Sequence, residues 1–304
     1  MTSGNGRDEI EALVVELRPA LHRYAARMVG SVLDGEDVVH DAIARAMAAL
    51  DRAPPDGDAT AWLFRIAHNV AIDHLRSRAR RTAEQEVEEN DLVTDGDETA
   101  GRVAAGAALS VFLQLPPLQR GTVILKDVLG YSNEEAAGIL DTTLAAAKAA
   151  LHRGRARLRI LADTPAPLRP TDPDDLRRLQ AYVDRFNARD FDAIRSMLAD
   201  EVRFELVARM ERGRAAFETY FTRYTEMTSW RLSVGLIEGR AVAIVRHPAD
   251  PVGAPIGLIL IDWADGRIVR LRDFYHARYI LDDASISSVG SPVGLGNGGP
   301  LSQP

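Results

Sequence analysis

The sequence lacks several features that would point to particular classes of protein. It contains no cysteine, which excludes disulfide bonds and thiolate metal sites. Its N-terminus does not show the basic-then-apolar order of a signal peptide, and no apolar run is long enough to span a bilayer. Lysine is almost absent, since Lys126 and Lys148 are the only lysines among 37 basic residues. We expect a cytoplasmic protein without a membrane segment.

The composition fits a globular protein with an uneven distribution of charge. A chain of 304 residues with 46% hydrophobic residues is long enough for two or three domains. The net charge, 37 − 44 = −7, does not by itself suggest nucleic-acid binding. Basic residues nevertheless concentrate at 76–81 and 148–159, with an acidic stretch at 84–98 between them. This distribution is more informative than the total.

The most informative stretch is 60–81, TAWLFRIAHNVAIDHLRSRARR, which is predicted to form a helix. Helical spacing places five apolar residues on one arc: Leu63, Ile66, Ala67, Val70 and Ala71. A second arc is polar and mainly basic, and Trp62 projects onto it: Arg65, Asn69, Asp73, Arg76 and Arg80. Cations, an amide and an aromatic ring are the groups that bind single-stranded nucleic acid. The alternative is an ordinary amphipathic helix with a solvated basic face.

Two further helices and a loop precede this stretch. Apolar steps of three or four predict a helix that ends at Gly30, with Leu13, Leu21 and Met28 on its buried face. After an expected turn at 31–36, a second helix is predicted over 37–50, and residues 51–59 are a loop by their prolines and glycine. The second helix has a polar outer face: Asp37, His40, Asp41 and Arg45. We therefore predict an all-α domain over 8–81.

A second helical segment follows an acidic linker, predicted to be flexible, at 82–103. Within 104–162 a helix is expected to end near Leu115, and another is predicted over 118–129. Ser132 and Glu135 form a capping-box pattern before a short helix, and a longer basic helix is predicted over 144–161. Two helices joined by a tight turn, the second one basic, have helix-turn-helix geometry, although many helical hairpins bind no DNA.

The last part of the chain changes from helical to strand periodicity after a proline-rich linker at 163–175. Helices are predicted at 176–198 and 213–224. Five strands follow the pattern of an antiparallel meander, with hairpin turns at 238–239 and 265–266. The predicted strands lie at 202–207, 230–236, 241–246, 256–263 and 268–275. We predict an α+β domain over 176–283 and a disordered tail over 284–304.

Two motifs in this order resemble a known family. EDVVHDAIARAM with WLFRIAHNVAIDHLRSRARR resembles region 2 of the extracytoplasmic-function sigma-70 factors, and LPPLQRGTVILKDVLGYSNEEAAGILDTTLAAAKAALHRGRARLR resembles region 4. The resemblance implies a dissociable subunit of RNA polymerase that binds the clamp and flap regions of the large subunits. It also implies recognition of the −35 and −10 promoter elements and opening of the DNA strands. No catalytic residue and no cofactor are expected.

The resemblance assigns roles to residues that match the motifs. Asp37, His40, Asp41 and Arg45 match the helix that docks on the polymerase clamp, and loop 51–59 matches the one that receives a flipped base. Contact with the −10 strand is implied for Trp62, Arg65, Asn69, Asp73, Arg76 and Arg80. Contact with the −35 element is implied for Lys148, His152, Arg153 and Arg155. The helix at 144–161 departs from the pattern, because alanines occupy positions where relatives often carry serine, threonine or arginine. Alanine makes no bidentate hydrogen bond to a base, so we expect this helix to position the protein on the DNA more than it distinguishes one base from another.

The C-terminal third resembles the SnoaL-like, nuclear-transport-factor-like cone, in which helices and a curved sheet surround a pocket. The matching segments are YVDRFNARDFDAIRSMLADEVRFEL, RGRAAFETYF and DGRIVRLRDFYH. Such an extension implies an attached regulator of sigma activity. Polar candidates for a pocket, which could hold a small-molecule ligand, are Arg246, His247, Asp262, Asp273 and His276. Structural rim or hairpin roles remain open for all of them, and no metal-binding spacing occurs.

Two other functions remain open. A ligand-responsive DNA-binding regulator would bind duplex DNA without polymerase and would not need Trp62. An enzyme with a SnoaL-like catalytic pocket would turn over a small cyclic ketone or ester through Asp262 or His276. The exposed aromatic predicted at position 62 favours the sigma factor over the DNA-binding regulator.

Overall fold

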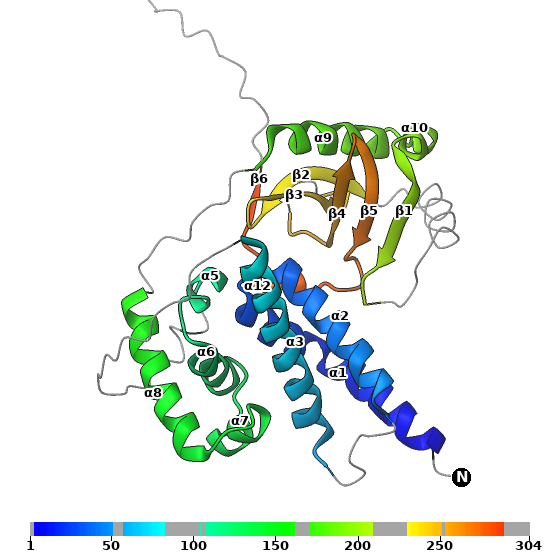
Figure 1. The fold of residues 1–304 in the computed structure, drawn as a ribbon. Coiled ribbons are helices and arrows are strands. Elements are labelled where there is room, and N and C mark those ends of the chain that lie inside the picture. Colours follow the sequence, from blue (N-terminus) through cyan, green and yellow to red (C-terminus); the bar gives the residue numbers. More distant parts are fainter. Residues whose placement is uncertain are drawn as a thin grey trace, which may run out of the picture. The chain divides into compact units, whose positions relative to one another are not determined.

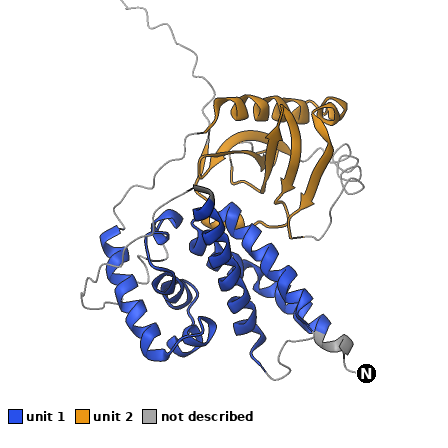
Figure 2. Cartoon of the chain, viewed as in Figure 1, with its two compact units in different colours: residues 1–167 blue, residues 168–304 orange. Residues whose placement is uncertain are grey.

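The computed structural model describes seven parts of the chain, drawn in colour in Figure 1: 3–50, 57–82, 104, 107–161, 171–208, 230–250 and 253–288. It divides into two compact units, residues 1–167 and residues 168–304 (Figure 2). Most of the loop 51–59, most of both linkers, the whole helix predicted at 213–224 and residues 289–304 of the tail lie outside the described residues.

Unit 1 begins with three long helices, α1 (Ser3–Val29), α2 (Val32–Ala48) and α3 (Ala59–Thr82). Gly30 separates α1 from α2 with φ +73°, a conformation that glycine adopts without a steric penalty. Ser31 then caps α2, because its side chain accepts a hydrogen bond from the Asp34 amide. The turn predicted at 31–36 is therefore wrong, since these residues form the cap and first turn of α2.

The rest of unit 1 is a bundle of shorter elements, α5 (Leu109–Phe112), α6 (Pro117–Val123), the π-helix η2 (Ile124–Val128), α7 (Asn133–Ile139) and α8 (Leu144–Leu161). The helix predicted over 118–129 thus changes to i→i+5 hydrogen bonds at Ile124. The predicted capping box is confirmed, with both the Ser132 and the Glu135 hydrogen bonds present. Helices α7 and α8 form the expected helix-turn-helix pair.

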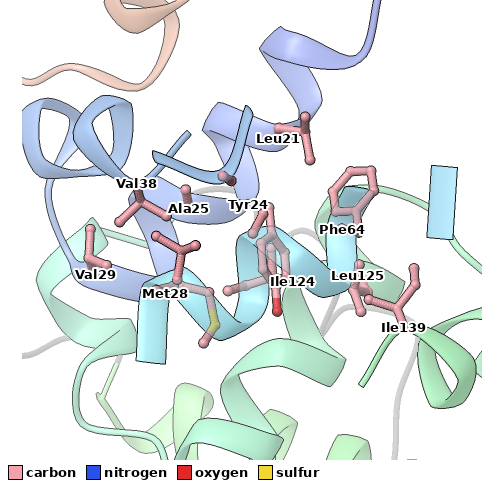
Figure 3. Close-up of a cluster of buried hydrophobic side chains, with 14 of the residues drawn as sticks. Leu21, Tyr24, Ala25, Met28, Val29, Val38, Phe64, Ile124, Leu125 and Ile139 are labelled. Carbon is pink, nitrogen blue, oxygen red and sulfur yellow. The ribbon is translucent and has the colours of Figure 1, made fainter. Parts of the chain in front are cut away.

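A single hydrophobic core joins these two sets of helices (Figure 3). Tyr24 on α1 meets Phe64 on α3 edge-to-face, with ring centroids 5.7 Å apart. Phe64 in turn meets Tyr131, which precedes α7, at 5.3 Å. Ile124 and Leu125 of η2 are fully buried in the same cluster. In this structure the two helical segments predicted from the sequence therefore share one core.

Unit 2 begins with α9 (Pro173–Asn187) and α10 (Phe191–Ser196). The predicted single helix at 176–198 is wrong, because the chain turns between these helices at Arg189, which has φ +63°. The helix also starts earlier than expected, with Asp172 as its cap and Pro173 at its first position. The apolar face of α9 is confirmed, since Leu179, Tyr182, Val183 and Phe186 are all buried.

Unit 2 continues with a six-stranded curved sheet in the order β1-β5-β4-β3-β2-β6 (Figure 1). The strands are β1 (Leu198–Leu206), β2 (Arg231–Ile237), β3 (Arg240–Arg246), β4 (Gly257–Ala264), β5 (Arg267–Asp273) and β6 (Ile286–Ser288), with the short helix α12 (Ile280–Asp283) before β6. The predicted hairpin turns are confirmed by positive φ at Glu238-Gly239 and Asp265-Gly266.

Two features of the sheet differ from the expectation. The sheet is mixed rather than antiparallel, because β1 runs parallel to β5, while β2 to β5 form the predicted meander. The tail predicted to be disordered from residue 284 includes β6, which pairs with the edge of β2 from Ile237 to Gly235. A free strand edge offers unpaired amides and carbonyls, and β6 forms backbone pairs with part of the edge of β2. The cone-like α+β fold itself is confirmed, with an open sheet.

Candidate nucleic-acid interface

The polar arc predicted on α3 is an exposed face of the helix. Its five members are exposed: Arg65, Asn69, Asp73, Arg76 and Arg80. Opposite them, Leu63, Ala67, Val70 and Ala71 are buried in the core of unit 1. Successive members of this set are three or four residues apart, so the exposed face extends along more than three helical turns. Four of these five residues can bind phosphates or base edges: the amide of Asn69 and the three arginines, Arg65, Arg76 and Arg80.

Trp62 does not lie fully on that face. It is half-buried and packs against the hydrophobic core, so the expectation that it projects away from the apolar arc is only partly right. An indole ring is large enough to reach the core with one edge while its other edge meets solvent. The exposed part leaves a ring surface at the start of α3.

Two residues of the α3 face already have partners within unit 1. The Arg65 guanidinium donates to the carbonyl of Gly138 on α7 at 3.0 Å. Asp73 accepts from Arg45 on α2, also at 3.0 Å. Both members of the second pair are more than half exposed, so the pair contributes little to stability. It does link a residue expected to bind polymerase to one expected to bind DNA.

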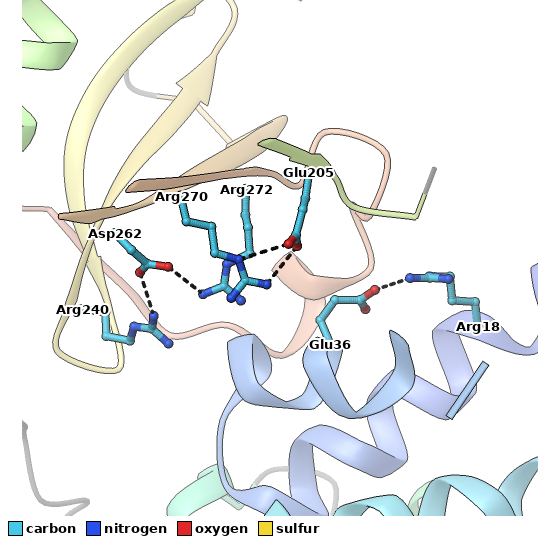
Figure 4. A network of polar contacts seen from close by, with 7 residues as sticks. All are labelled: Arg18, Glu36, Glu205, Arg240, Asp262, Arg270 and Arg272. Carbon is cyan, nitrogen blue, oxygen red and sulfur yellow. Dashed lines mark hydrogen bonds and ion pairs between the residues drawn. The ribbon is translucent and has the colours of Figure 1, made fainter. Parts of the chain in front are cut away.

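The candidates for polymerase binding lie on α2. Asp41 and Arg45 are exposed, whereas Asp37 and His40 are half-buried. Near the start of the same helix, Glu36 forms an ion pair with Arg18 of α1 (Figure 4). Helix α2 thus presents acidic and basic groups along one side while Val38, Val39 and Ala42 enter the core.

A buried arginine connects the two sets of helices in unit 1. Arg120 on α6 donates to the Met28 carbonyl of α1 at 2.5 Å. It also donates to the carbonyls of Leu113 and Leu115, at 3.1 and 2.8 Å. Burial lowers the pKa of Arg120 to about 10, so the guanidinium stays charged at neutral pH. One side chain therefore satisfies three carbonyl groups from two parts of the unit.

A second buried contact lies beside it. The Tyr24 hydroxyl and His68 Nδ1 are 2.8 Å apart, joining α1 to α3. Burial, and secondarily the charge of Arg120, lowers the pKa of His68 to about 4, so its ring is neutral. Burial also raises the pKa of Tyr24 above its ordinary value. The layer between the two sets of helices therefore combines apolar packing with specific hydrogen bonds.

Sequence reasoning missed both Arg120 and His68, although a signal existed. His68 follows Phe64 by four residues, and Arg120 precedes Ile124 by four, so each occupies a core position in an apolar helical pattern. A polar residue at a core position must find a buried partner. The partners themselves, 44 and 92 residues away in sequence, were not predictable from the pattern.

The residues of the basic helix α8 that are expected to contact the −35 element lie in three different environments. Lys148 is exposed, and His152 and Arg153 are half-buried. Arg155 is bound by Asp127 of η2 through two hydrogen bonds, of 2.9 and 2.5 Å. The buried arc of α8 consists of small and apolar residues, including Ala147, Ala150 and Leu151. Helix α8 therefore exposes less hydrogen-bonding capacity than α3 does.

The pocket candidates of unit 2 have different surroundings. Asp262 forms ion pairs with Arg240 and Arg272, beside a second pair between Glu205 and Arg270 (Figure 4). Asp273 lies opposite Ile259, a core residue, and is almost fully buried. Of the other three candidates, Arg246 ends β3, His247 follows it, and His276 lies in a turn after β5. Arg246 donates to Ser233 and to the Gly253 carbonyl, and His247 and His276 are exposed.

Two structural features are absent from the described residues. No group of three or more His, Cys, Asp and Glu residues there could hold a metal ion. None of the helices in that part of the chain is long and apolar enough to cross a membrane.

Three protein families match successive parts of the chain. The families are described as Sigma-70 region 2, over residues 13–81, and Sigma-70 region 4, over residues 106–158. The third is the SnoaL-like domain, over residues 179–271. The first range contains α2 and nearly all of α3, the second runs from before α5 to within α8, and the third runs from within α9 to within β5.

Several curated proteins are similar to this chain. The ECF RNA polymerase sigma factor SigG of Mycobacterium tuberculosis is 26% identical over 95% of this chain and 85% of its own length. EcfG of Rhodopseudomonas palustris is 30% identical, over 51% of this chain and 83% of its own length. SigM of Mycobacterium tuberculosis is 32% identical, over 45% and 69%. The chain belongs to the ECF RNA polymerase sigma factors.

Two solved structures resemble this sigma factor. One is the extracytoplasmic function sigma factor SigJ of Mycobacterium tuberculosis, 23% identical over 86% of this chain and 95% of that one, with a TM-score of 0.34. The other is CnrH in complex with the cytosolic domain of CnrY, 26% identical over 54% and 94%, with a TM-score of 0.39. The sigma factor thus combines regions 2 and 4, which fit promoter recognition in transcription initiation, with a SnoaL-like domain.

Proposed function

We propose that this sigma factor binds the clamp and flap regions of core RNA polymerase in the cytoplasm and opens promoters through α3, with α8 placing it on the −35 element. The observation that carries the proposal is the exposed polar face of α3, which begins beside the half-exposed ring of Trp62. Extruding a base costs a few kcal/mol, and stacking on an aromatic ring returns about 1–3 kcal/mol. Binding energy can therefore separate the strands without catalysis.

The proposed contacts divide among three helices. On α2, Asp37, His40, Asp41 and Arg45 dock on the polymerase clamp. On α3, the exposed face contacts the −10 strand together with Trp62. On α8, Lys148 is the candidate for a base edge, and His152, Arg153 and Arg155 are the other −35 residues. The two remaining candidate functions fit this distribution less well, because neither needs a polymerase-binding helix beside a DNA-binding one.

To bind both promoter elements at once, the two sets of helices that share the core of unit 1 must separate from each other. The −35 and −10 elements are about 25 base pairs apart, roughly 85 Å at 3.4 Å per base pair. A compact unit of 167 residues has a radius of gyration of about 15 Å. The 22 residues of 82–103 span at most about 75 Å when extended. The closed unit therefore precedes promoter binding, and its two helical sets part when both elements are bound.

Two experiments test this function. In the first, purified full-length chain and core polymerase are mixed with a promoter library, and open complexes are detected by permanganate footprinting. Failure to bind core polymerase would refute the proposal. In the second, exposed Glu16 and Glu134 are replaced by cysteine for fluorescent labelling, which the absence of native cysteine makes selective. Energy transfer between the dyes should fall when core polymerase and promoter are added, and unchanged transfer would contradict separation.

Unit 2 is proposed to modulate this activity rather than to catalyse a reaction. Its fold has its own core, so removing residues 172–304 should change transcription without abolishing binding to core polymerase. Equal transcription by the truncated and full-length chains would show that unit 2 has no regulatory role.

A small-molecule ligand is the second proposal for unit 2. The Tyr182 hydroxyl is fully buried and has no hydrogen-bond partner among the described residues. Burial and the charge of Asp273 raise its pKa, so it is a neutral donor near a carboxylate. Such a group suits a ligand that carries a hydrogen-bond acceptor. A thermal-shift screen of small cyclic ketones and esters against the native chain and Tyr182→Phe tests this role, and stabilisation that survives the substitution would count against it.

A further inference from the structure

The recognition helix α8 is attached to the rest of unit 1 at two adjacent positions. At Gly154, a Cβ atom would lie 2.7 Å from Val123 Cγ2 and 3.1 Å from the Gln119 carbonyl oxygen. Only glycine lets α8 approach α6 this closely without displacement. The next residue is Arg155, whose guanidinium binds Asp127 on η2. The glycine contact sets the distance of α8 from α6, and the ion pair resists rotation of α8 about its axis.

The ion pair has the geometry of a structural contact. Both oxygens of Asp127 are used, by Nε and by Nη2 of Arg155. The Asp127 side chain is 3% exposed and that of Arg155 is 26% exposed. The hydrogen bond to Asp127 raises the pKa of Arg155 above its ordinary value. If Arg155 moved to a phosphate, a nearly buried carboxylate would lose its counter-charge, which costs more than a single phosphate contact returns.

The position of Arg155 along α8 makes the pair relevant to DNA. Arg155 follows Lys148 by seven residues, which is two helical turns and returns to nearly the same side of the helix. Because a helix of this length is stiff, the rotation set at Arg155 is transmitted to Lys148. Asp127 belongs to a π-helical segment, a local irregularity that is common at functional sites.

We propose that Asp127 and Arg155 are a positioning pair that sets the rotation of α8 on the −35 element, and that Arg155 makes no phosphate contact. The inference rests on the proposed role of α8 at the −35 element. It changes the role expected for Arg155 from gripping DNA to orienting the helix that carries Lys148.

The test uses the full chain with core polymerase. A promoter is first selected by the wild-type holoenzyme from DNA randomised at both elements, and a second DNA carries a scrambled −35 element. Affinity for both DNAs is measured over a range of salt concentrations for Arg155→Lys, Arg155→Gln, Asp127→Asn and the double variant of Arg155→Lys with Asp127→Asn. Arg155→Lys keeps a positive charge beside Asp127, so we expect the variant to fold. A lysine cannot form the two parallel hydrogen bonds that Arg155 forms, so the orientation of the pair is lost. Arg153→Gln, on the same helix and also assigned to the −35 element, is the matched control.

If the pair positions α8, the ratio of the affinities for the two DNAs should be about 5- to 10-fold smaller in each single variant than in the wild type. The double variant should lose no more than a single one. The slope of affinity against salt should stay unchanged for all four variants. Arg153→Gln should instead weaken binding to both DNAs equally and reduce the slope by about 0.9, as expected for one lost phosphate contact.

Three outcomes would overturn the inference. Full discrimination by Arg155→Lys and Asp127→Asn would show that the pair does not orient α8. A salt slope reduced by about 0.9 in Arg155→Gln, with equal losses on both DNAs, would assign Arg155 to a phosphate. A wild-type holoenzyme that binds both DNAs equally would refute the role of α8 at the −35 element as well, which separates failure of the proposed function from failure of the inference alone.

Discussion

Helices α3 and α8 both carry arginines and are both proposed to bind promoter DNA, yet they offer DNA different groups. Helix α3 exposes a continuous face of arginines and an amide, with a half-exposed aromatic ring at its start. Helix α8 has alanines along most of its first two turns, exposes Lys148, and engages Arg155 in an internal ion pair. Charge alone positions a protein on DNA, whereas amides and rings discriminate bases. The difference supports our proposal that α3 discriminates bases while α8 mainly places the sigma factor on the DNA.

The largest effect is expected where the two helical sets are held together. Arg120→Met removes the donors that satisfy the carbonyls of Met28, Leu113 and Leu115, which are then buried without partners. We expect the free energy of unfolding of unit 1 to fall by roughly 3 kcal/mol or more. Chemical denaturation of the full chain measures this, with the exposed Arg76→Met as control, expected to change it by less than about 0.5 kcal/mol. Similar effects of both variants would mean that Arg120 does not bridge the two sets.

The same layer should make unit 1 sensitive to acid. The folded chain keeps His68 neutral with a pKa of about 4, whereas the unfolded chain protonates it at its ordinary pKa of 6.5. The contribution of this contact is therefore complete above pH 6.5 and is lost progressively as the pH falls towards 4. Once both states are protonated, the free energy of unfolding has fallen by about 3 kcal/mol through this residue.

Comparison with His68→Gln isolates this residue from the carboxylates that also titrate in acid. Denaturation curves between pH 7 and pH 4.5 should show the native chain losing stability faster than the variant. Parallel curves would mean that His68 is not held neutral between Tyr24 and Arg120.

Replacing the aromatic ring on α3 should have the next largest effect. Trp62→Ala removes a stacking surface worth about 1–3 kcal/mol, so we expect open-complex formation to fall about 5- to 150-fold. Binding to core polymerase should be unchanged. Because Trp62 also packs against the core, unfolding must be measured alongside, and Trp62→Phe, which keeps a ring, should retain most of the activity. Normal opening by Trp62→Ala would contradict the role proposed for α3.

The smallest effect is expected on α8. Lys148→Ala should cost about 1 kcal/mol of affinity and relax the preference at one position of the −35 element. Lys126, the other lysine of the chain, lies half-buried on η2, and Lys126→Ala is the matched control. An effect of Lys148→Ala spread over several −35 positions would indicate that α8 discriminates more than we propose.

The periodic features of this sigma factor could be predicted from its sequence, and the contacts between distant segments could not. The buried arc of α3, the capping box at Ser132 and the hairpin turn at Glu238-Gly239 each depend on residues within a few positions of one another. The contacts of Arg65 with Gly138 and of Arg120 with Met28 span 73 and 92 residues. Nothing in the local pattern specifies such partners.

The same limit explains the errors. The parallel pairing of β1 with β5 joins segments about 70 residues apart, and β6 pairs with β2 across about 50 residues, so both were missed in favour of the local meander. On α3, the exposed face was predicted correctly because it is periodic. Trp62 was not, since a ring of its size reaches beyond the arc that its position defines.

A base-by-base substitution of the selected promoter tests the central claim most directly. Open-complex formation by the wild-type holoenzyme is measured for each single change in the −10 and −35 elements, and the summed losses of the two elements are compared. If α3 discriminates and α8 mainly places the protein, changes in the −10 element should cost about 1–3 kcal/mol each at the most sensitive positions, and changes in the −35 element clearly less. Equal or larger losses in the −35 element would contradict the account.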